Sequence, residues 1–185
     1  EMLDDRALLA LQGPMAVQVL TRHAPGCGDL GFMGFAAMDV GGISCGVSRA
    51  GYTGEDGFEI SVANDQSVDL ARLLLGEDVV EPIGLGARDS LRLEAGLCLY
   101  GHDLDTTTTP IEGGLTWAIG KRRRENGGFP GDKIILDQLA NGTDRRRVGL
   151  AMAGRAPARE GADIIDADGK SIGTVTSGGF GPTGG

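Results

Sequence analysis

The sequence predicts an α+β fold in which antiparallel sheets are flanked by helices, and its composition supports this class. Hydrophobic residues make up 41% of the 185-residue chain, which is enough for a core, but aromatic residues make up only 4%, so the core must be mostly aliphatic. Thirty-three glycines are far above average usage and favour turn-rich β structure over a helix bundle. Segments with the two-residue period of half-buried strands alternate along the chain with amphipathic helical patterns.

The first segments follow this alternation. Residues 7–11 predict a short strand that ends at a Gly-Pro pair, and Pro14 suits the first turn of a helix over residues 15–22. Residues 31–40 are apolar, and Gly41-Gly42 has the composition of a hairpin turn that leads into the next strand.

The central feature is a pair of strands joined by a glycine-punctuated turn. Apolar residues alternate with polar or small ones at 43–48 and again at 58–62. Three glycines between them supply positions that accept positive φ or close backbone approach. If Phe58 and Ile60 face the core, Glu59 must point to the opposite side of the sheet.

Two helices are predicted after the central strands. Asn64 is expected to cap the first, over residues 65–75, and Pro82 precedes the second, over about residues 85–95. The expected inward-facing residues are Val68, Ala71, Leu74 and Leu75 in the first helix and Ala87, Leu91 and Ala95 in the second. Arg88 lies one step round from the second stripe, at the border between core and cleft.

The rest of the chain predicts a change of organisation. Residues 104–128 look irregular, and Asp132 is expected to cap a short helix through Leu139. We place a domain boundary near Asn141-Gly142, so that residues 1–143 belong to one domain and residues 144–185 begin a second. Strand-like pieces alternate with glycine turns in that second domain, at 148–152, 163–165 and 171–176. They are too few to close a barrel or sandwich.

The charge balance limits the kinds of partner. Seventeen Lys and Arg against 26 Asp and Glu give a net charge of -9, which disfavours a non-specific nucleic-acid binder. Two basic clusters depart from this trend, Lys121–Arg124 and Arg145–Arg147. They are interpreted either as a solvated loop and a strand end, or as a docking patch for an acidic partner.

Cysteine usage and hydropathy limit the compartment. Cys27, Cys45 and Cys98 are odd in number and widely spaced without a CxxC pair, so neither a zinc site nor a disulfide framework is predicted. A reducing compartment is expected. No apolar run has the length of a membrane span, and no signal peptide is visible.

Two motif-bearing stretches, the GYTGEDGFEI turn and strand at 51–60 and the GLGARDSLRLEAG segment at 84–96, resemble the folate-binding region of the glycine cleavage system T-protein (aminomethyltransferase) family. Further matching segments occur in the same order along nearly the whole chain, at 109–113, 117–124, 129–131, 145–150 and 173–179. The resemblance implies a folate-binding GcvT-type domain followed by the start of a C-terminal β-barrel domain.

The resemblance also implies an activity. In this family an aminomethyl group on the lipoyl arm of the H protein is transferred to tetrahydrofolate, which forms 5,10-methylenetetrahydrofolate and releases ammonia. The implied partners are therefore tetrahydrofolate and the lipoyl-carrying H protein, with no metal, nucleic acid or membrane. The implied compartment is the bacterial cytoplasm or the mitochondrial matrix. Lys121, Arg122, Arg123 and Arg124 are candidates for docking the H protein.

Four residues match or adjoin the folate site of the family. Glu59, in the GFEI motif, matches the folate-binding glutamate of the family. A carboxylate suits this role, since it can accept two parallel N–H bonds from a pterin. Arg88, in the ARDS motif, matches the folate-contacting arginine, and Tyr52 falls in the GYTGE turn. Trp117 is a further candidate. Without the resemblance, these would be a surface carboxylate, an arginine paired with Asp89 or Glu94, a turn tyrosine and a core tryptophan.

No catalytic acid or base is assigned within this chain. The family's catalytic aspartate belongs to an N-terminal part expected upstream of Glu1, and an arginine assigned to substrate binding is expected beyond Gly185. The fragment alone is therefore expected to be inactive. His102 and Asp103 are adjacent, but no nucleophile signature accompanies them, and they receive no catalytic role.

Other interpretations stay open from the sequence. The folate domains of sarcosine and dimethylglycine dehydrogenases share the fold and would capture a methylene group made by a flavin. A folate-binding protein of iron–sulfur cluster maintenance is a non-catalytic alternative, although its characteristic cysteine motif is not found. A last interpretation is an incomplete chain that neither folds stably nor binds.

Overall fold

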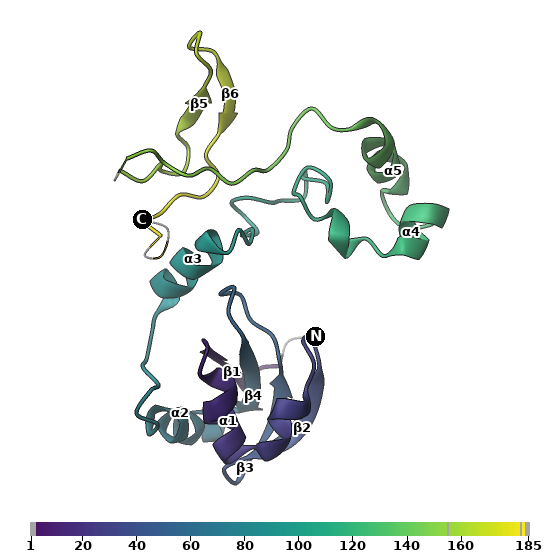
Figure 1. The fold of residues 1–185 in the computed structure, drawn as a ribbon. Coiled ribbons are helices and arrows are strands. Elements are labelled where there is room, and N and C mark those ends of the chain that lie inside the picture. Colours follow the sequence, from purple (N-terminus) through teal and green to yellow (C-terminus); the bar gives the residue numbers. More distant parts are fainter. Residues whose placement is uncertain (1–2, 155, 182, 184–185) are drawn as a thin grey trace. The chain divides into compact units, whose positions relative to one another are not determined.

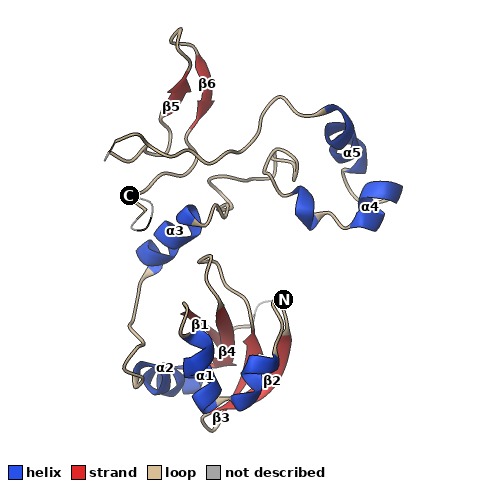
Figure 2. Ribbon diagram, in the orientation of Figure 1, coloured by secondary structure: helices blue, strands red, loops and turns tan. Residues whose placement is uncertain are grey.

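The computed structural model describes residues 3–154, 156–181 and 183. The chain divides into two compact units, Glu1–Ala95 and Gly96–Gly185, and each is described by itself (Figures 1 and 2). The strands of the first unit are β1 (Arg6–Gln12), β2 (Phe35–Val40), β3 (Ile43–Ser48) and β4 (Gly57–Ala63). Its helices are α1 (Ala16–His23), α2 (Ser67–Leu75) and α3 (Leu85–Glu94), with 3-10 turns at Pro25–Asp29 and Asn64–Gln66.

The four strands form one antiparallel sheet in the order β1-β4-β3-β2. β2 and β3 form a hairpin closed by Gly41 and Gly42, both with positive φ, as the Gly-Gly pair predicted. β3 pairs with β4 across the glycine-rich turn, with Ser48 opposite Glu59. The strands and the first helix expected from the sequence are therefore confirmed, to within one residue or a few at each end.

The core of this unit lies on one face of the sheet. Three side chains of β4 point into it and are fully buried, those of Phe58, Ile60 and Val62. They pack with the apolar sides of α1 and α2, represented by Leu20 and Leu70. Because strand side chains alternate between faces, Glu59 points to the opposite face, as predicted.

The buried face of α2 differs from the prediction. Leu70 is fully buried, whereas Val68 is 55% exposed and Leu75 is also exposed. Leu70 and Leu74 form the inward stripe, so the inward position predicted for Leu74 is confirmed. Apolar residues occur on more than one side of this helix, and its packing on the core selects Leu70 over Val68. Asn64 does not cap it, because its amide donates to the carbonyl of Asp4 and it belongs to the preceding 3-10 turn.

The interior of α3 also differs from the prediction. The expected apolar stripe is not buried: Ala95 is exposed, and Ala87 and Leu91 are only half-buried. The buried residue of the helix is Arg92, whose guanidinium pairs with Asp89 at 2.8 Å. Small or apolar residues at an i, i+4 spacing indicate one face of a helix, but they do not show which face packs against the rest of the protein. The buried face of α3 therefore could not be predicted from this spacing.

The second unit contains more helix than expected. A 3-10 turn covers Thr116–Ala118, α4 spans Lys121–Asn126 and α5 spans Asp132–Asn141, so the region expected to be irregular includes the short helix α4. Gly131, in a left-handed conformation, precedes α5, so Asp132 is its first residue and not its cap. Trp117 is 78% exposed, which rules out the core position considered for it.

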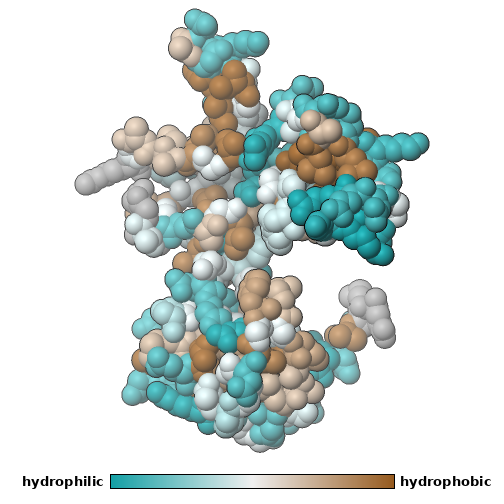
Figure 3. Space-filling model, turned by 45° about the vertical axis from the view of Figure 1, so that its right-hand side comes forward, coloured by the Kyte–Doolittle hydropathy of each residue, from teal (hydrophilic) through white to brown (hydrophobic). Residues whose placement is uncertain are grey.

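A two-stranded hairpin follows, formed by β5 (Asp163–Ile165) and β6 (Ser171–Thr174). It confirms the strand-like pieces expected at 163–165 and 171–176, but residues 148–152 form no strand. Figure 3 shows its hydrophilic tip above apolar sides, where Ile165 and Ile172 are exposed. The domain boundary expected after residue 143 stays a prediction. None of the helices in the described part of the chain combines the length and apolar character that a membrane crossing requires.

The burial of α2 gives the first prediction. Leu70→Ala should lower the free energy of unfolding by about 2–5 kcal/mol, because it leaves a cavity in a filled core. Val68→Ala, in the same helix, is the control and should change it by about 0.5 kcal/mol or less. Urea unfolding of both variants measures the difference. Equal losses would contradict the assignment of the inward face.

Candidate functional site

Glu59 lies on the open face of the sheet and is held there by its neighbours in β4. Both flanking residues are fully buried in the core, while the side chain of Glu59 is half-buried on the other face. Its strand partners there are Ala10 of β1 and Ser48 of β3. These small side chains leave room beside the carboxylate. Within the described part of the chain, the carboxylate has no hydrogen-bond or ion-pair partner.

Phe35 of β2 borders the same face, and the sequence analysis did not single it out. The register places it opposite Ser48, and a Cβ atom built at Gly46 would lie 3.0 Å from its ring. The ring therefore lies over Gly46, and 66% of the residue is exposed. A glycine inside a strand often marks such a close approach, so Gly46 was the signal that could have indicated it.

The turn between β3 and β4 is closed by an ion pair. The guanidinium of Arg49 binds both carboxylate oxygens of Asp56, at 3.0 and 2.6 Å, and also donates to the carbonyl of Leu30 at 2.8 Å. The hydrogen bond from Arg49 holds the pKa of Asp56 below its ordinary value, and the same bond raises the pKa of Arg49. Arg49 also lies over the ring of Phe58, 5.8 Å from its centroid.

Tyr52, at the tip of this turn, contacts Arg88 of α3. The guanidinium carbon lies 5.5 Å from the centroid of the tyrosine ring, which is cation–π geometry. The turn also approaches α3 at Gly54, where a Cβ atom would lie 2.6 Å from that of Ala95. Asp89 pairs with Arg92, so the ion pair considered between Arg88 and Asp89 is not formed. The structure therefore brings together two of the four predicted folate residues.

Trp117 belongs to the second unit, in the 3-10 turn before α4. In the same unit, His102 and Asp103 turn to different partners. His102 Nδ1 lies 2.9 Å from the Glu160 carboxylate, whereas Asp103 accepts from the backbone of Leu99 and from Thr176. The two adjacent residues therefore do not form a His–Asp pair with each other.

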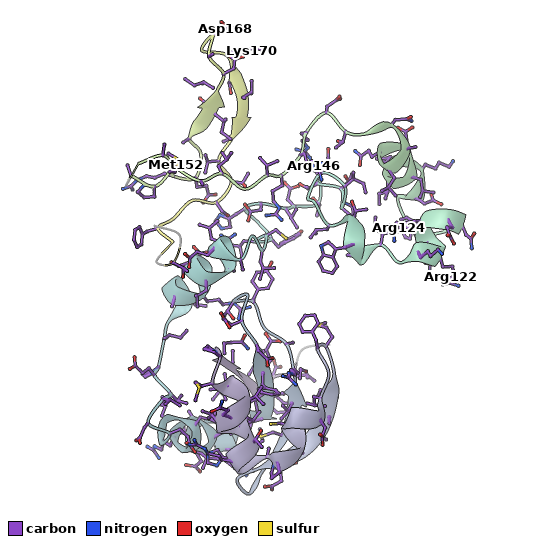
Figure 4. All side chains as sticks on the ribbon, viewed as in Figure 1. Arg122, Arg124, Arg146, Met152, Asp168 and Lys170 are labelled. Carbon is purple, nitrogen blue, oxygen red and sulfur yellow. The ribbon has the colours of Figure 1, made fainter. Side chains whose placement is uncertain are left out.

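The first basic cluster forms most of α4. Lys121 lies 3.7 Å from Glu125, and Arg123 donates to the carbonyl of Gly128 at 2.8 Å. Arg122 and Arg124 are exposed, and no partner is found for either within the described part of the chain. Figure 4 shows both side chains on α4, at the edge of this unit.

The second basic cluster is largely structural. Arg145 binds the carboxylate of Glu112 and the carbonyl of Thr107, which lowers the pKa of Glu112. Arg147 donates to the carbonyls of Gly113 and Gly96, at 3.0 Å each. Only the middle arginine, Arg146, lacks a partner within the described residues. The interpretation of this cluster as a strand end is therefore wrong, because the segment forms no strand and is held by hydrogen bonds of its arginine side chains.

Arg146 lines a pocket of about 370 Å³ in the second unit, together with Ile111, Thr116, Gln138, Leu139, Gly142 and Thr143. A neighbouring hollow of about 670 Å³ runs along α5, from Lys133 to Asp144. Neither contains a residue predicted to bind folate. Among the described residues, no group of three or more His, Cys, Asp or Glu side chains is arranged to hold a metal ion.

Comparison with known proteins gives matches to two family models. The GCVT N-terminal domain matches residues 1–123, and the glycine cleavage T-protein C-terminal barrel domain matches residues 145–185. The two family models therefore match residues in both predicted domains. Of the eight residues predicted to bind folate or to dock a partner, seven lie within the first match and Arg124 lies just outside it.

Individual relatives agree with these models. An aminomethyltransferase, mitochondrial, from Pisum sativum is 56% identical over 182 residues, which cover 97% of this chain and 44% of that protein. A probable aminomethyltransferase, mitochondrial, from Schizosaccharomyces pombe is 50% identical and is covered over 47% of its length. The crystal structure of glycine cleavage system aminomethyltransferase T from Bartonella henselae superimposes with a TM-score of 0.88 at 49% identity, over 96% of this chain and 48% of that one. The chain thus spans about half the length of the relatives it matches.

The Arg49–Asp56 pair predicts a dependence of stability on pH. Because the folded pKa of Asp56 lies below the unfolded value of about 3.9, its carboxylate stabilises the fold above about pH 4. That contribution is lost as the pH falls through the folded pKa. The difference in unfolding free energy between the wild type and Asp56→Asn should therefore shrink between pH 6 and pH 3.

Urea unfolding at several pH values measures this difference. Arg49→Met is the matched variant, because it removes the guanidinium that lowers the pKa of Asp56. In an Arg49→Met background, the effect of Asp56→Asn should depend much less on pH, because only the weaker hydrogen bond from the backbone N–H of Gly57 then still lowers the pKa of Asp56. A difference that stays constant from pH 6 to pH 3 in the wild-type background would show that the pair does not couple to folding.

Proposed function

The chain belongs to the glycine cleavage T-protein family, and we propose that the protein it represents is a tetrahydrofolate-dependent aminomethyltransferase. It would transfer the methylene group from the aminomethyl-lipoyl H protein to tetrahydrofolate and release ammonia. The relatives named aminomethyltransferase support this reaction over folate capture by a flavin dehydrogenase. The names of several relatives include the word mitochondrial, which supports our proposal of a location in the mitochondrial matrix or the bacterial cytoplasm.

The observation that supports the folate site best is the carboxylate of Glu59. A charged group on a strand, flanked by small residues and without an internal partner, has its hydrogen-bonding capacity left for a ligand. A pterin presents an amino group and a ring N–H side by side, and one carboxylate can accept both in a bidentate arrangement. Glu59 is therefore proposed to orient the pterin ring against the open face of the sheet.

Arg88 and Tyr52 are proposed to contact the other parts of folate. The cation–π contact with the ring of Tyr52 holds the guanidinium of Arg88 in position. The positive charge of this guanidinium suits the carboxylates of the folate tail. Tyr52 offers an aromatic surface at the same place. Trp117, an exposed aromatic residue of the second unit, is proposed as a further folate contact.

Arg122 and Arg124 are proposed to dock an acidic surface of the H protein. Of the four basic residues at the start of α4, these two have no partner within the described residues, whereas Arg123 and Lys121 have acceptors nearby. Exposed charges of this kind act mainly on the rate of encounter and on partner choice. Arg145 and Arg147 are not part of this proposal, since they hold the backbone.

The direct test of the reaction uses the complete gene product that includes this sequence. We expect it to bind tetrahydrofolate in a calorimetric titration and to release ammonia when the aminomethylated H protein is added. Folate binding without ammonia release would move the assignment to the dehydrogenase or maintenance-protein classes. No residue of this chain is assigned as the catalytic acid or base.

The role of Glu59 predicts a loss of affinity. Glu59→Ala should raise the Kd for tetrahydrofolate by about tenfold to a hundredfold, because a charged bidentate contact contributes about 1.5–3 kcal/mol. Glu81→Ala is the control, an exposed carboxylate outside the sheet, and should leave the Kd unchanged. Isothermal titration calorimetry gives both values. An unchanged Kd for Glu59→Ala would remove this residue from the site.

The docking surface predicts a separation of two measurements. The double variant Arg122→Glu/Arg124→Glu should lower the rate of H-protein-dependent ammonia release, most strongly at low ionic strength, while the Kd for tetrahydrofolate stays the same. The double variant Arg72→Glu/Lys170→Glu reverses two exposed charges outside α4 and is the control for net charge. Unchanged ammonia release in the double variant would contradict the docking role, whereas a parallel loss of folate affinity would indicate misfolding of the variant.

A further inference from the structure

Gln12, the last residue of β1, lies next to the turn that presents Tyr52. It pairs with Gly57 at the start of β4, two residues before Glu59 on the same strand. Because strand side chains alternate, the side chain of Gln12 shares the open face with the carboxylate of Glu59. It lies nearer the turn than Glu59 does, and nothing in the sequence around it suggests a ligand contact.

The amide of Gln12 bonds three separate points around the turn. Its Nε2 donates to the carbonyl of Ala50 at 2.9 Å and to that of Phe58 at 3.2 Å. Its Oε1 accepts from the hydroxyl of Thr53 at 3.1 Å. Two carbonyl acceptors and one hydroxyl fix the orientation of the amide, because only its nitrogen can serve both carbonyls. Both donors and the acceptor are thus used inside the protein.

The turn is shaped to receive this amide. A Cβ atom at Gly51 would lie 1.8 Å from Oε1 of Gln12, and one at Gly57 would lie 2.6 Å from its Cδ and 2.6 Å from the carbonyl of Leu11. Neither glycine has a positive φ, so both positions need room and not an unusual backbone. Gln12 therefore fills the space that side chains at these positions would take.

Thr53 links the amide of Gln12 to the next residues of the turn by hydrogen bonds. Its side chain is buried, and while its hydroxyl donates to Gln12 it also accepts from the backbone N–H of Glu55 at 3.3 Å. Tyr52 thus lies between Gly51, which packs on the amide of Gln12, and Thr53, which donates to it. The residues on both sides of Tyr52 are held by one side chain from a different strand.

We propose that Gln12 is a positioning residue of the folate site: its amide fixes the backbone on both sides of Tyr52, so that the tyrosine ring is presented beside Arg88, without Gln12 touching the ligand. This inference rests on the proposed folate-binding function. It differs from the role of Arg49 and Asp56, which close the turn at its base and do not bond the residues next to Tyr52.

The first arm of the test measures the Kd for tetrahydrofolate in the complete protein by calorimetry. Gln12→Ala should raise the Kd on the order of tenfold, because three hydrogen bonds and the filling of the turn are lost. The KM for tetrahydrofolate should rise with it, while kcat at saturating folate is retained. Gln18→Ala, an exposed glutamine on α1, is the matched control and should bind like the wild type.

The second arm asks whether Gln12 acts through the turn. In a Tyr52→Ala background, Gln12→Ala should have no further effect on the Kd, because the ring that it positions is gone. Gly51→Ala should weaken binding in the wild type but not in a Gln12→Ala background, since the clashing amide is then absent. Circular dichroism and the thermal midpoint identify any variant that is not folded.

The outcomes separate this inference from the function on which it rests. If the wild type does not bind tetrahydrofolate, the proposed function fails and the role of Gln12 fails with it. If the wild type binds and Gln12→Ala binds equally well, or if its effect is undiminished without Tyr52, the function stands and the positioning role is wrong. The positioning role is supported if Gln12→Ala raises the Kd for tetrahydrofolate in the wild-type background and leaves it unchanged in the Tyr52→Ala background.

Discussion

The pairing of β3 with β4 is the constraint on which the rest of the first unit depends. Phe58, Ile60 and Val62 are buried in the core, and the two-residue period of a strand then leaves Glu59 no direction except the opposite face. A slip of one residue in this register would exchange the two faces and bury a charge. The same hydrophobic burial that stabilises the sheet therefore also aims the carboxylate, and no separate interaction is needed to hold it.

The turn between these strands obtains its shape from a residue of another strand and from an ion pair of its own. It is rich in glycine, so few of its own side chains can order it, and glycine-rich segments lose much conformational entropy on folding. Gln12 fills its interior and the Arg49–Asp56 pair closes its base. The absence of side chains at Gly51 and Gly57 makes room for the amide of Gln12, and this amide in turn orders the glycine-rich turn.

Local sequence patterns were sufficient for the strands of the first unit and insufficient for the contacts between distant residues, and in the second unit they predicted a strand at 148–152 that is not formed. The alternation at 43–48 and 58–62 identified the sheet and the direction of Glu59 because both follow from the strand period alone. The inward face of α2 was misjudged because apolar residues occur on both sides of that helix, and its packing on the sheet selects Leu70 over Val68. Gln12 gave no local signal, since its bonds reach residues 38 to 46 positions away.

The basic residues illustrate the same limit for the site. In the sequence, Arg122, Arg124, Arg145 and Arg147 are equivalent members of two charged runs. In the fold, Arg145 and Arg147 bind a carboxylate and carbonyls that belong to their own unit, and their charge is directed inward. An arginine whose donors are satisfied in this way gives a partner little to bind, because a new contact would have to replace an existing one. The distribution of internal acceptors, and not the density of positive charge, therefore decides which arginines of this acidic protein are left for the proposed docking of an acidic partner.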